Sequence, residues 1–388
     1  MKSFLKNFLT IFISVIVTLA LLELGIRYLN SYMGHYPQKD PILHHSLVPK
    51  AKLTTSNNEF EVTYQINSYG LRDQEYPLEK PKDVFRILIL GDSYTFGIGS
   101  NLEDTFSKIL EKKLQTDYPD KKIEVINGGC SSYSPLLEYL FLIYKGLALN
   151  PDMVLLNYDM SDVQDDYKYG QVAIKDTQGK PIKVPPVDVQ YYYREIKKGY
   201  KSKYSFLEKS ELYQFIVKRY YQLVGKKEAP YFYEQAQIVA GNIEYDRDLP
   251  MRENGGDWKK YFENSAENLR WIQELLKKKH IQFVVAIYPY GNLLNEKEWA
   301  IGRKLRGFDA KTYSSKLFDY LDEFCKVQGI PFLNMLPYFQ VSHDFPLFYP
   351  YDGHFTPAGN KVAAHAIEDF LIKENLLTIP LHYLQYSK

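Results

Sequence analysis

The sequence predicts an α/β domain with a parallel, doubly wound sheet, preceded by an apolar N-terminal helix. From residue 84 onward, short apolar runs alternate with amphipathic stretches of helical period. This alternation is typical of a parallel sheet covered by helices. No internal repeat interrupts it. The third observation is an uncharged apolar run close to the N-terminus, which is long enough to span a membrane.

The N-terminal run predicts a membrane anchor. Lys2 and Lys6 precede apolar chain that is uncharged from Asn7 to Leu22 and continues to about Leu29. A helix of roughly 20 residues spans a bilayer, and no small-x-small cleavage site follows. We therefore expect residues 1–30 to form a cytoplasmic tip and an uncleaved signal anchor. A cleaved signal peptide and a buried core helix are the alternatives. The lysines place the N-terminus in the cytoplasm, so the α/β domain is expected outside it, in the periplasm or at the cell exterior.

Composition excludes some partners and pairings. The net charge of +1 over 388 residues gives no overall attraction for nucleic acid. Thirty-five tyrosines suit extended polar ligands such as glycans, and equally suit ordinary packing. Cys130 and Cys325 fall at opposite edges of the predicted sheet. A five-residue strand is roughly 17 Å long, whereas the Cα atoms of a disulfide lie within about 7 Å. We expect two free thiols.

Two further segments flank or interrupt the α/β pattern. Residues 31–83 form a lead-in, polar and proline-broken over 31–58, with an alternating stretch from Glu59 to Ile66 that predicts one strand. The α/β domain itself is expected over 84–378. Within it, an insertion at about 164–256 lacks the alternation.

The insertion is rich in tyrosine and lysine. It carries Tyr191-Tyr192-Tyr193 followed by Arg194, Lys197, Lys198, Lys201 and Lys203. One hypothesis is a stacking and charge platform for a polysaccharide or for lipid headgroups. The other is a solvated cap that shapes the cleft.

The expected elements of the domain follow from the apolar runs and the helical periods. The strands are predicted at 84–90, 123–126, 153–158, 283–288 and 331–335. The helices are predicted around 106–114, from 135, at 258–278, at 312–326 and from 357 to about 375.

Polar groups suited to acyl transfer follow these strands. The four stretches are Gly91-Asp92-Ser93, Asn127-Gly128-Gly129, Asp159-Met160-Ser161-Asp162 and Asp352-Gly353-His354. Ligands of such sheets bind outside the carboxyl ends of the strands. Acyl transfer needs a nucleophile, a base, a group that orients the base, and donors for the oxyanion. All of these are present at one edge.

Each group also has a plainer interpretation when taken alone. Ser93 suits the cap of a following helix, and His354 suits a hydrogen-bonded loop. Gly129 suits a turn, and Asp352 suits the cap of a turn. His44-His45 and His343 are expected at the surface or in packing, and no metal-ligand spacing is present. We expect no metal and no cofactor.

The chain resembles the SGNH (GDSL) hydrolase superfamily over roughly residues 36–375. The blocks that carry the resemblance are Gly91-Asp92-Ser93, Asn127-x-Gly129, Asp352-Gly353-His354 with Pro357-x-Gly359, and Asn67-Ser68-Tyr69-Gly70-Leu71-Arg72-Asp73, which is similar to a stretch of membrane-anchored members. The resemblance implies a three-layer α/β/α fold with a flavodoxin-like sheet. It also implies a Ser93–His354–Asp352 triad, with an oxyanion hole made of the Ser93 and Gly129 N–H groups and a side chain of the third block.

Two positions depart from the family pattern. Ser161 stands where an Asn is usual, so a flexible hydroxyl replaces a fixed amide as the third oxyanion donor. Ser132 replaces the glycine that usually follows three residues after Gly129. Loss of a good oxyanion donor costs roughly 10²–10³ in rate, so we expect a weaker donor, a substitute group or modest activity.

The sequence thus supports three hypotheses of function. The leading one is an O-acyl, usually acetyl, transferase or esterase that acts on extracytoplasmic carbohydrate through acyl-Ser93. The resemblance also suggests a membrane-bound O-acyltransferase as a partner. The second is a glycan-binding module without turnover. The third is a lipid or thioester hydrolase at the membrane surface.

Overall fold

The computed structural model describes residues 2–32, 38–186, 258–305 and 314–377, with Ser210, Leu212, Tyr213, Ile216 and Leu249–Met251 between them. The chain divides into two units, one of Met1–Tyr36 with Gln190–Gly241 and one of Pro37–Val189 with Asn242–Lys388. The tyrosine- and lysine-rich stretch that the sequence singled out lies outside the described residues.

The first unit contains the long helix α1, Lys2–Tyr32. Its segment Lys6–Ile26 has a mean hydropathy of 2.4, and none of it is buried. By length and composition it is able to cross a membrane. In the same unit, the Glu23 carboxylate accepts hydrogen bonds from Ser210 Oγ at 2.9 Å and Leu212 N at 2.8 Å.

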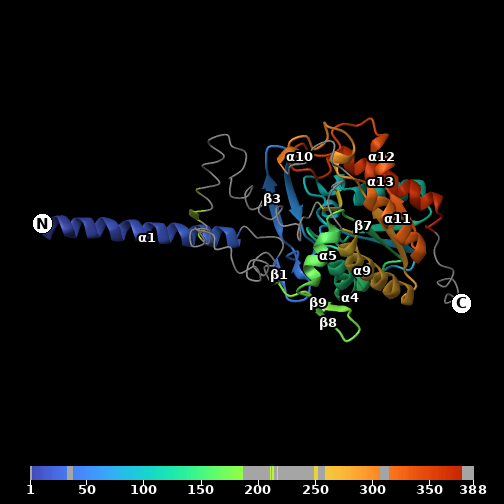
Figure 1. Cartoon of the computed structure of the whole chain (residues 1–388), viewed down its shortest axis with the longest axis horizontal. Coiled ribbons are helices and arrows are strands. Elements are labelled where there is room, and N and C mark those ends of the chain that lie inside the picture. Colours follow the sequence, from blue (N-terminus) through green and yellow to red (C-terminus); the bar gives the residue numbers. More distant parts are fainter. Residues whose placement is uncertain are drawn as a thin grey trace. The chain divides into compact units, whose positions relative to one another are not determined.

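The second unit contains a five-stranded parallel sheet (Figure 1). Its strands are β5 (Val84–Gly91), β6 (Lys122–Asn127), β7 (Met153–Tyr158), β10 (Gln282–Ile287) and β11 (Phe332–Asn334). They lie in the order β11-β10-β7-β5-β6, which is the flavodoxin-like order. Every residue of β5 and β7 is buried, as expected for strands covered on both faces. The predicted fold class is confirmed.

Helices cover the two faces of the sheet. The main ones are α3 (Phe106–Asp117), α4 (Pro135–Tyr144), α5 (Asp162–Gly170), α9 (Lys259–Lys278), α11 (Lys316–Gln328) and α13 (Pro357–Lys373). Helix α3 packs on α13, whereas α9 packs on α4 and α5. The first connection runs outward from β5 to β6, and the next returns past β5 to β7. Because parallel crossovers are right-handed, α3 and α4 lie on opposite faces.

Short elements complete the unit. They are α2 (Ser93–Phe96), η1 (Leu102–Asp104), η2 (Gly146–Leu149), η5 (Leu249–Met251), η6 (Gly291–Leu293), α10 (Gly302–Leu305), α12 (Leu336–Gln340) and the hairpin of β8 (Ile174–Lys175) with β9 (Pro181–Lys183). Helix α5 and this hairpin occupy the start of the predicted insertion.

The lead-in contains more structure than its sequence indicates. Strands β1 (Gln38–Asp40) and β2 (His44–Ser46) pair, and β3 (Lys52–Ser56) pairs antiparallel with β4 (Glu61–Gln65). Only β4 lies within the predicted strand. The others fall where the sequence predicts irregular polar chain. Their residues are largely exposed or half-buried, so they lack the apolar alternation that identifies a strand.

Both cysteines are free and buried, as predicted. Burial raises the pKa of the Cys130 thiol to about 12 and raises that of Cys325 as well. Neither thiol is therefore a reactive thiolate at neutral pH.

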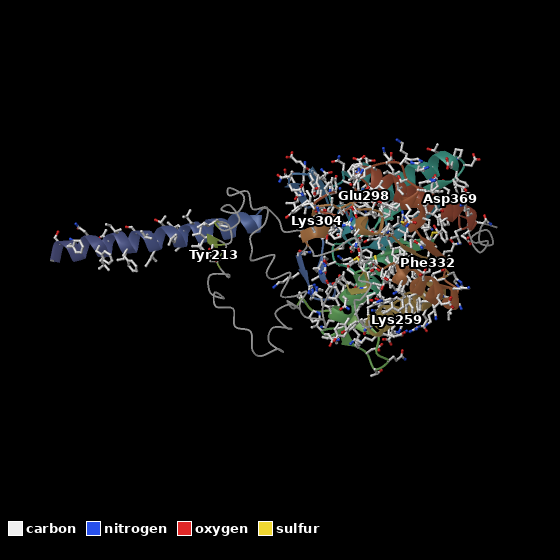
Figure 2. All side chains as sticks on the ribbon, turned by 45° about the horizontal axis from the view of Figure 1, so that its top comes forward. Tyr213, Lys259, Glu298, Lys304, Phe332 and Asp369 are labelled. Atoms are coloured by element: carbon white, nitrogen blue, oxygen red, sulfur yellow. The ribbon has the colours of Figure 1, made fainter. Side chains whose placement is uncertain are left out.

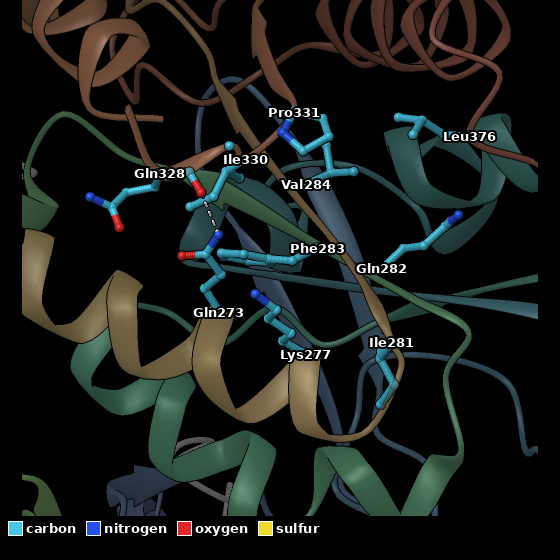
Figure 3. Close-up of a pocket in the computed structure, with 11 residues that line it drawn as sticks. Gln273, Lys277, Ile281, Gln282, Phe283, Val284, Gln328, Ile330, Pro331 and Leu376 are labelled. Atoms are coloured by element: carbon cyan, nitrogen blue, oxygen red, sulfur yellow. Dashed lines mark hydrogen bonds between the residues drawn. The ribbon is translucent and has the colours of Figure 1, made fainter. Parts of the chain in front are cut away.

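A pocket of about 350 Å³ lies at the amino ends of β10 and β11 (Figure 3). Gln282 begins β10 in this pocket, and Pro331 precedes β11. Ser93 follows the carboxyl end of β5. Because all five strands are parallel, this pocket belongs to the edge of the sheet opposite Ser93.

Candidate active site

The turn after β5 presents Ser93. Gly91 has φ +154°, and a Cβ there would come 2.2 Å from Thr95 Oγ1, so a larger residue would displace the turn. The Asp92 carboxylate accepts the Tyr94 N–H at 2.9 Å and caps α2. Ser93 is the first residue of α2 and is half-exposed. Among the described residues, no acceptor receives its N–H.

The loop before α13 presents Asp352 and His354. Gly353 between them has φ +93°, and a Cβ there would come 2.6 Å from Trp299 Nε1. Thr356 then starts α13, its hydroxyl accepting the Gly359 N–H at 3.2 Å. Thr356 is therefore the N-cap of α13. A glycine and a helix cap together fix the path of this loop.

The two segments bring three predicted residues together. His354 Nε2 lies 2.8 Å from Ser93 Oγ, although 261 positions separate the residues in sequence. His354 Nδ1 pairs with Asp352 Oδ1. The side chains of His354 and Asp352 are 18% and 23% exposed, so small molecules reach them. The arrangement is a nucleophile, a base within reach of it, and a carboxylate that orients the base.

The ring of Tyr94, which the sequence did not single out, lies beside the imidazole, and Tyr288 packs on Tyr94. The Tyr94 ring centroid lies 4.7 Å from that of His354, and Tyr94 OH donates to Gly353 O at 2.7 Å. Tyr288 OH donates to Asp92 Oδ1 at 3.1 Å and also to Asp159 Oδ2. Burial holds the pKa of Tyr288 well above its usual value, so its hydroxyl remains a donor. These tyrosines fix the position of Asp92 and of the His354 loop.

The second block connects the end of β6 to α2. Asn127 Nδ2 donates to Thr95 O at 2.8 Å, and Asn127 Oδ1 accepts the Gly129 N–H at 2.9 Å. A Cβ on Gly129 would come 2.2 Å from Phe96 N. Only glycine permits this approach of two backbones. The Gly129 N–H predicted to face the oxyanion is thus engaged within its own loop.

The third block is deeply buried. Ser161 is 1% exposed, its N–H donates to Asp159 Oδ1 at 2.6 Å, and its hydroxyl donates to Asp165 Oδ2 at 3.4 Å. Ser93 and the His354–Asp352 pair are therefore brought together, whereas Gly129 and Ser161 bond elsewhere. The use of these two as oxyanion donors stays a prediction, and it requires their present hydrogen bonds to exchange.

Buried acids lie beside the third block. Burial, followed by the nearby Asp166 and Asp92, raises the pKa of Glu138 well above its usual value. Burial and the nearby Glu138 do the same for Asp162. Burial thus favours the protonated form of both carboxyls relative to an exposed acid. The signal in the sequence was a single acidic residue within the apolar helix α4.

The histidines outside the pair do not gather into a metal site. Within the described ranges, no group of three or more His, Cys, Asp or Glu side chains is arranged to hold a metal ion. His45 Nε2 bonds to Ser131 O at 2.7 Å, its Nδ1 lies 2.9 Å from His44 Nδ1, and burial lowers the pKa of His45 to about 4. His343 is exposed. These positions fit the packing and surface roles expected.

Comparison with known families finds a match to the C-terminal part of the chain. Residues 252–384 match the family described as "SGNH hydrolase-like domain, acetyltransferase AlgX". This part of the chain is similar to the SGNH hydrolase-like family. The matched range includes Asp352 and His354, and Ser93 lies upstream of it. Comparison with curated proteins gives no match.

Solved structures similar to this SGNH domain are distant in sequence. A lipolytic protein of the G-D-S-L family from Desulfitobacterium hafniense has 13% identity and a TM-score of 0.36, covering 74% of this chain and 99% of that one. An acetylxylan esterase from Geobacillus stearothermophilus has 13% identity and a TM-score of 0.38, covering 74% and 94%. These values say nothing about the substrate.

Proposed function

We propose that the protein is a serine-dependent O-acyl transferase or esterase that acts on extracytoplasmic carbohydrate through an acyl-Ser93 intermediate. The observation that carries the proposal is the 2.8 Å contact of Ser93 Oγ with His354 Nε2, with Asp352 on the far side of the ring. The matching family is described by an acetyltransferase, which supports acetyl as the group transferred.

The chemistry follows from these positions. His354 Nε2 takes the Ser93 proton as Oγ attacks the acyl carbonyl, and Asp352 stabilises the imidazolium that forms. The imidazolium then protonates the leaving oxygen, which leaves the acyl group on Ser93. A sugar hydroxyl or water then attacks this ester while His354 takes its proton, and the imidazolium returns that proton to Ser93 Oγ as the bond between Ser93 and the acyl group breaks. The Ser93 N–H, at the start of α2, is the donor available to the carbonyl oxygen.

The proposed location rests on α1. Its apolar segment Lys6–Ile26 is able to span a bilayer, and Lys2 and Lys6 lie at its N-terminal side. Positive residues favour the cytoplasmic side. The SGNH domain then works outside the cytoplasmic membrane, where polysaccharides and other glycans are exposed. A membrane-bound O-acyltransferase is the proposed source of acyl groups.

The direct test is covalent labelling. Full-length protein is treated with a fluorophosphonate probe or with candidate acyl donors, and the modified residue is mapped by mass spectrometry. We expect modification at Ser93 and none in Ser93→Ala. Labelling of another residue, or of none in a folded sample, would contradict the proposed nucleophile.

Transfer and hydrolysis are separated by the fate of the acyl group. Labelled acetyl donor is supplied with and without a glycan acceptor. Label recovered on the glycan supports transfer, and label recovered only as free acetate supports an esterase. A strong preference for long acyl chains would instead indicate the lipid or thioester hydrolase.

A glycan-binding module without turnover is the second candidate. The observation that favours it is that both the Gly129 N–H and the Ser161 hydroxyl are engaged away from Ser93. Such a module would bind glycan and would remain unlabelled by the fluorophosphonate. Labelling of Ser93 therefore decides between the two.

A further inference from the structure

We infer that residues 57–73, within the lead-in, position the catalytic residues of the active site. Three of its side chains, Glu59, Arg72 and Asp73, each hold one of the segments that carry the candidate site. We call these three residues the clamp. The inference rests on the proposed function, because it assigns the clamp a role in acyl transfer by Ser93.

Glu59 holds the loop before α13 that carries Asp352 and His354, which we call the acid loop. Its two carboxylate oxygens accept the N–H groups of Tyr351 at 2.7 Å and Asp352 at 2.8 Å. The neighbouring Phe60 ring packs on Tyr349, with centroids 5.0 Å apart. Hydrogen bonds to a carboxylate are about twice as strong as neutral ones. Glu59 therefore fixes the backbone of the residue that orients His354.

Glu59 itself is held by the turn between β3 and β4. Asn57 Oδ1 accepts the N–H groups of Glu59 at 2.7 Å and Phe60 at 2.9 Å, and the Asn57 N–H donates back to Phe60 O at 2.9 Å. Three hydrogen bonds within four residues restrict the turn. The carboxylate is thus presented from a rigid hairpin tip, as a positioning group requires.

Arg72 holds the helix that Ser93 begins. Its Nη1 donates to Phe96 O at 2.7 Å and Gly97 O at 2.5 Å, and its Nη2 donates to Ser100 O. The guanidinium is 1% exposed and lies 4.4 Å from the centroid of Tyr64. Carbonyls at a helix C-terminus attract cations. Since α2 has only four residues, fixing its end fixes Ser93 at its beginning.

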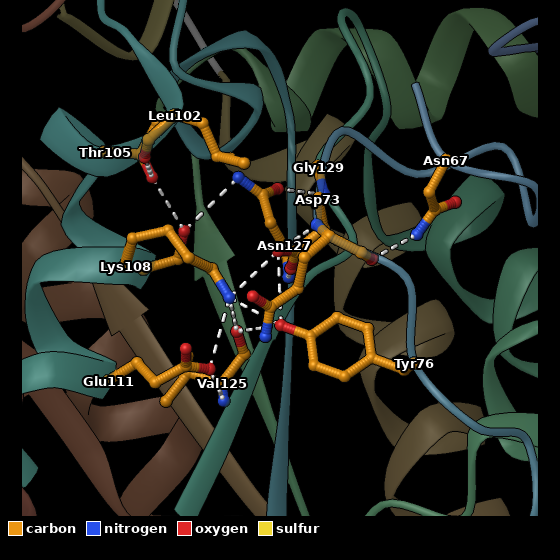
Figure 4. Close-up of polar contacts among 12 residues, drawn as sticks. Asn67, Asp73, Tyr76, Leu102, Thr105, Lys108, Glu111, Val125, Asn127 and Gly129 are labelled. Carbon is orange, nitrogen blue, oxygen red and sulfur yellow. Dashed lines mark hydrogen bonds and ion pairs between the residues drawn. The ribbon is translucent and has the colours of Figure 1, made fainter. Parts of the chain in front are cut away.

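Asp73 holds the second block (Figure 4). Its Oδ2 accepts the Asn127 N–H at 2.7 Å, and its Oδ1 pairs with Lys108 Nζ at 2.9 Å. Lys108 Nζ also contacts Glu111 Oε2 at 3.1 Å. Asn127 in turn reaches Thr95 O within α2. Asp73 thus acts on the nucleophile helix through Asn127.

A second carboxylate, that of Glu298, also holds the acid loop, and it separates a role in folding from a role in catalysis. Glu298, labelled in Figure 2, accepts the N–H groups of Leu347 at 2.9 Å and Phe348 at 3.0 Å. Glu298 therefore keeps the upstream half of the loop in place without Glu59. Loss of Glu59 releases only the part next to His354, so the change is expected in catalysis more than in folding.

The experiment uses Glu59→Ala, with Glu61→Ala as the matched control. Glu61 is an exposed glutamate on β4, two residues further along the hairpin. Hydrolysis of an aryl acetate by the full-length protein gives kcat and KM. We expect Glu59→Ala to lower kcat roughly ten- to a hundredfold with KM within about twofold, because small displacements of a catalytic group cost up to about 10²-fold. Glu61→Ala stays within about twofold of the wild type.

A conservative variant and a hydrogen-exchange measurement test the role of Glu59 further. Glu59→Gln retains one acceptor oxygen, and we expect it to recover about half of the lost kcat on a logarithmic scale. Hydrogen exchange of the 349–355 peptide, which needs no turnover, should be faster in Glu59→Ala than in Glu61→Ala. Equal kcat and equal exchange in these variants would overturn the inference. A wild-type protein that is not labelled at Ser93, with faster exchange in Glu59→Ala, would overturn the proposed function and the catalytic role of the clamp, but not the hold of Glu59 on the loop.

Discussion

The two sides of the candidate site are built differently. On one side, which we call the nucleophile side, Ser93 and His354 bond to each other. The buried charges behind them are paired, as Asp73 is with Lys108 at 2.9 Å. On the other side, which we call the third-block side, Asp162 of the third block lies near Glu138. Among the described residues, no ion pair includes either of these two carboxyls.

The difference shows what each side is able to do. Burial raises the pKa of Asp73 too, but Lys108 opposes that shift. The ion pair and its hydrogen bonds fix geometry, so the nucleophile side is organised before substrate binds. Buried carboxyls without cations take up protons instead, and their pKa values rise. On the third-block side, burial thus favours the protonated form of Glu138 and Asp162, and among the described residues no ion pair opposes it.

The largest effect is expected from the nucleophile side. Ser93→Ala and His354→Ala should each lower turnover of an acyl ester by about 10⁴-fold or more, because each removes a member of a unit that acts together. The double variant should be hardly worse than either single one. Turnover by Ser56→Ala, an exposed serine of β3, and by the exposed His343→Ala should stay unchanged. Equal turnover in Ser93→Ala and wild type would show that another residue performs the chemistry.

The sequence predicted the nucleophile side better than its supports. The blocks around Ser93 and His354 are local patterns, and the alternation of strands and helices places them at one edge. The bond from Glu59 to the acid loop joins residues 292 positions apart, and no local pattern marks it. The engagement of the Gly129 N–H with Asn127 depends on a rotamer, which a motif does not specify. Long-range polar contacts were therefore missed, although the residue types were visible.

The next effect concerns the free energy of unfolding and the buried ion pairs on the nucleophile side. Lys108→Met leaves Asp73 and Glu111 without their buried cation. Loss of one partner of a buried charge group typically costs about 3–5 kcal/mol, and we expect a loss of this size in the free energy of unfolding in urea. Lys112→Met, which changes an exposed lysine of the same helix, should cost less than about 0.5 kcal/mol. Similar losses in the two variants would mean that the buried network contributes little.

A smaller effect, of opposite sign, is expected when Glu138 on the third-block side is replaced: stability should fall less as the pH rises. The pKa of Glu138 is raised in the folded protein, so folding takes up a proton once the pH exceeds the unfolded value near 4.5. The stabilising contribution is complete below that value and is lost as pH rises toward the folded pKa. Glu138→Gln removes this loss. Between pH 5 and pH 8, the unfolding free energy should fall by about 1–3 kcal/mol less in Glu138→Gln than in wild type.

Glu103→Gln, at an exposed position in η1, is the matched control for that slope. Its dependence on pH should follow the wild type. A Glu138→Gln variant with the same slope as the wild type would mean that Glu138 is ionised in the folded protein. The third-block side would then carry charge, and the contrast between the two sides would disappear.

The smallest effect is expected at Ser161. A long hydrogen bond of 3.4 Å joins its hydroxyl to Asp165, and the residue is 1% exposed. If it stays there during the reaction, Ser161→Ala should change kcat by less than about threefold. If it turns toward the substrate as an oxyanion donor, the same change should cost roughly 10²–10³. Turnover of an aryl acetate by Ser161→Ala, with unfolding measured in parallel, separates these outcomes. A loss of that size would mean that the third block contributes a donor in the transition state, despite its present bonds.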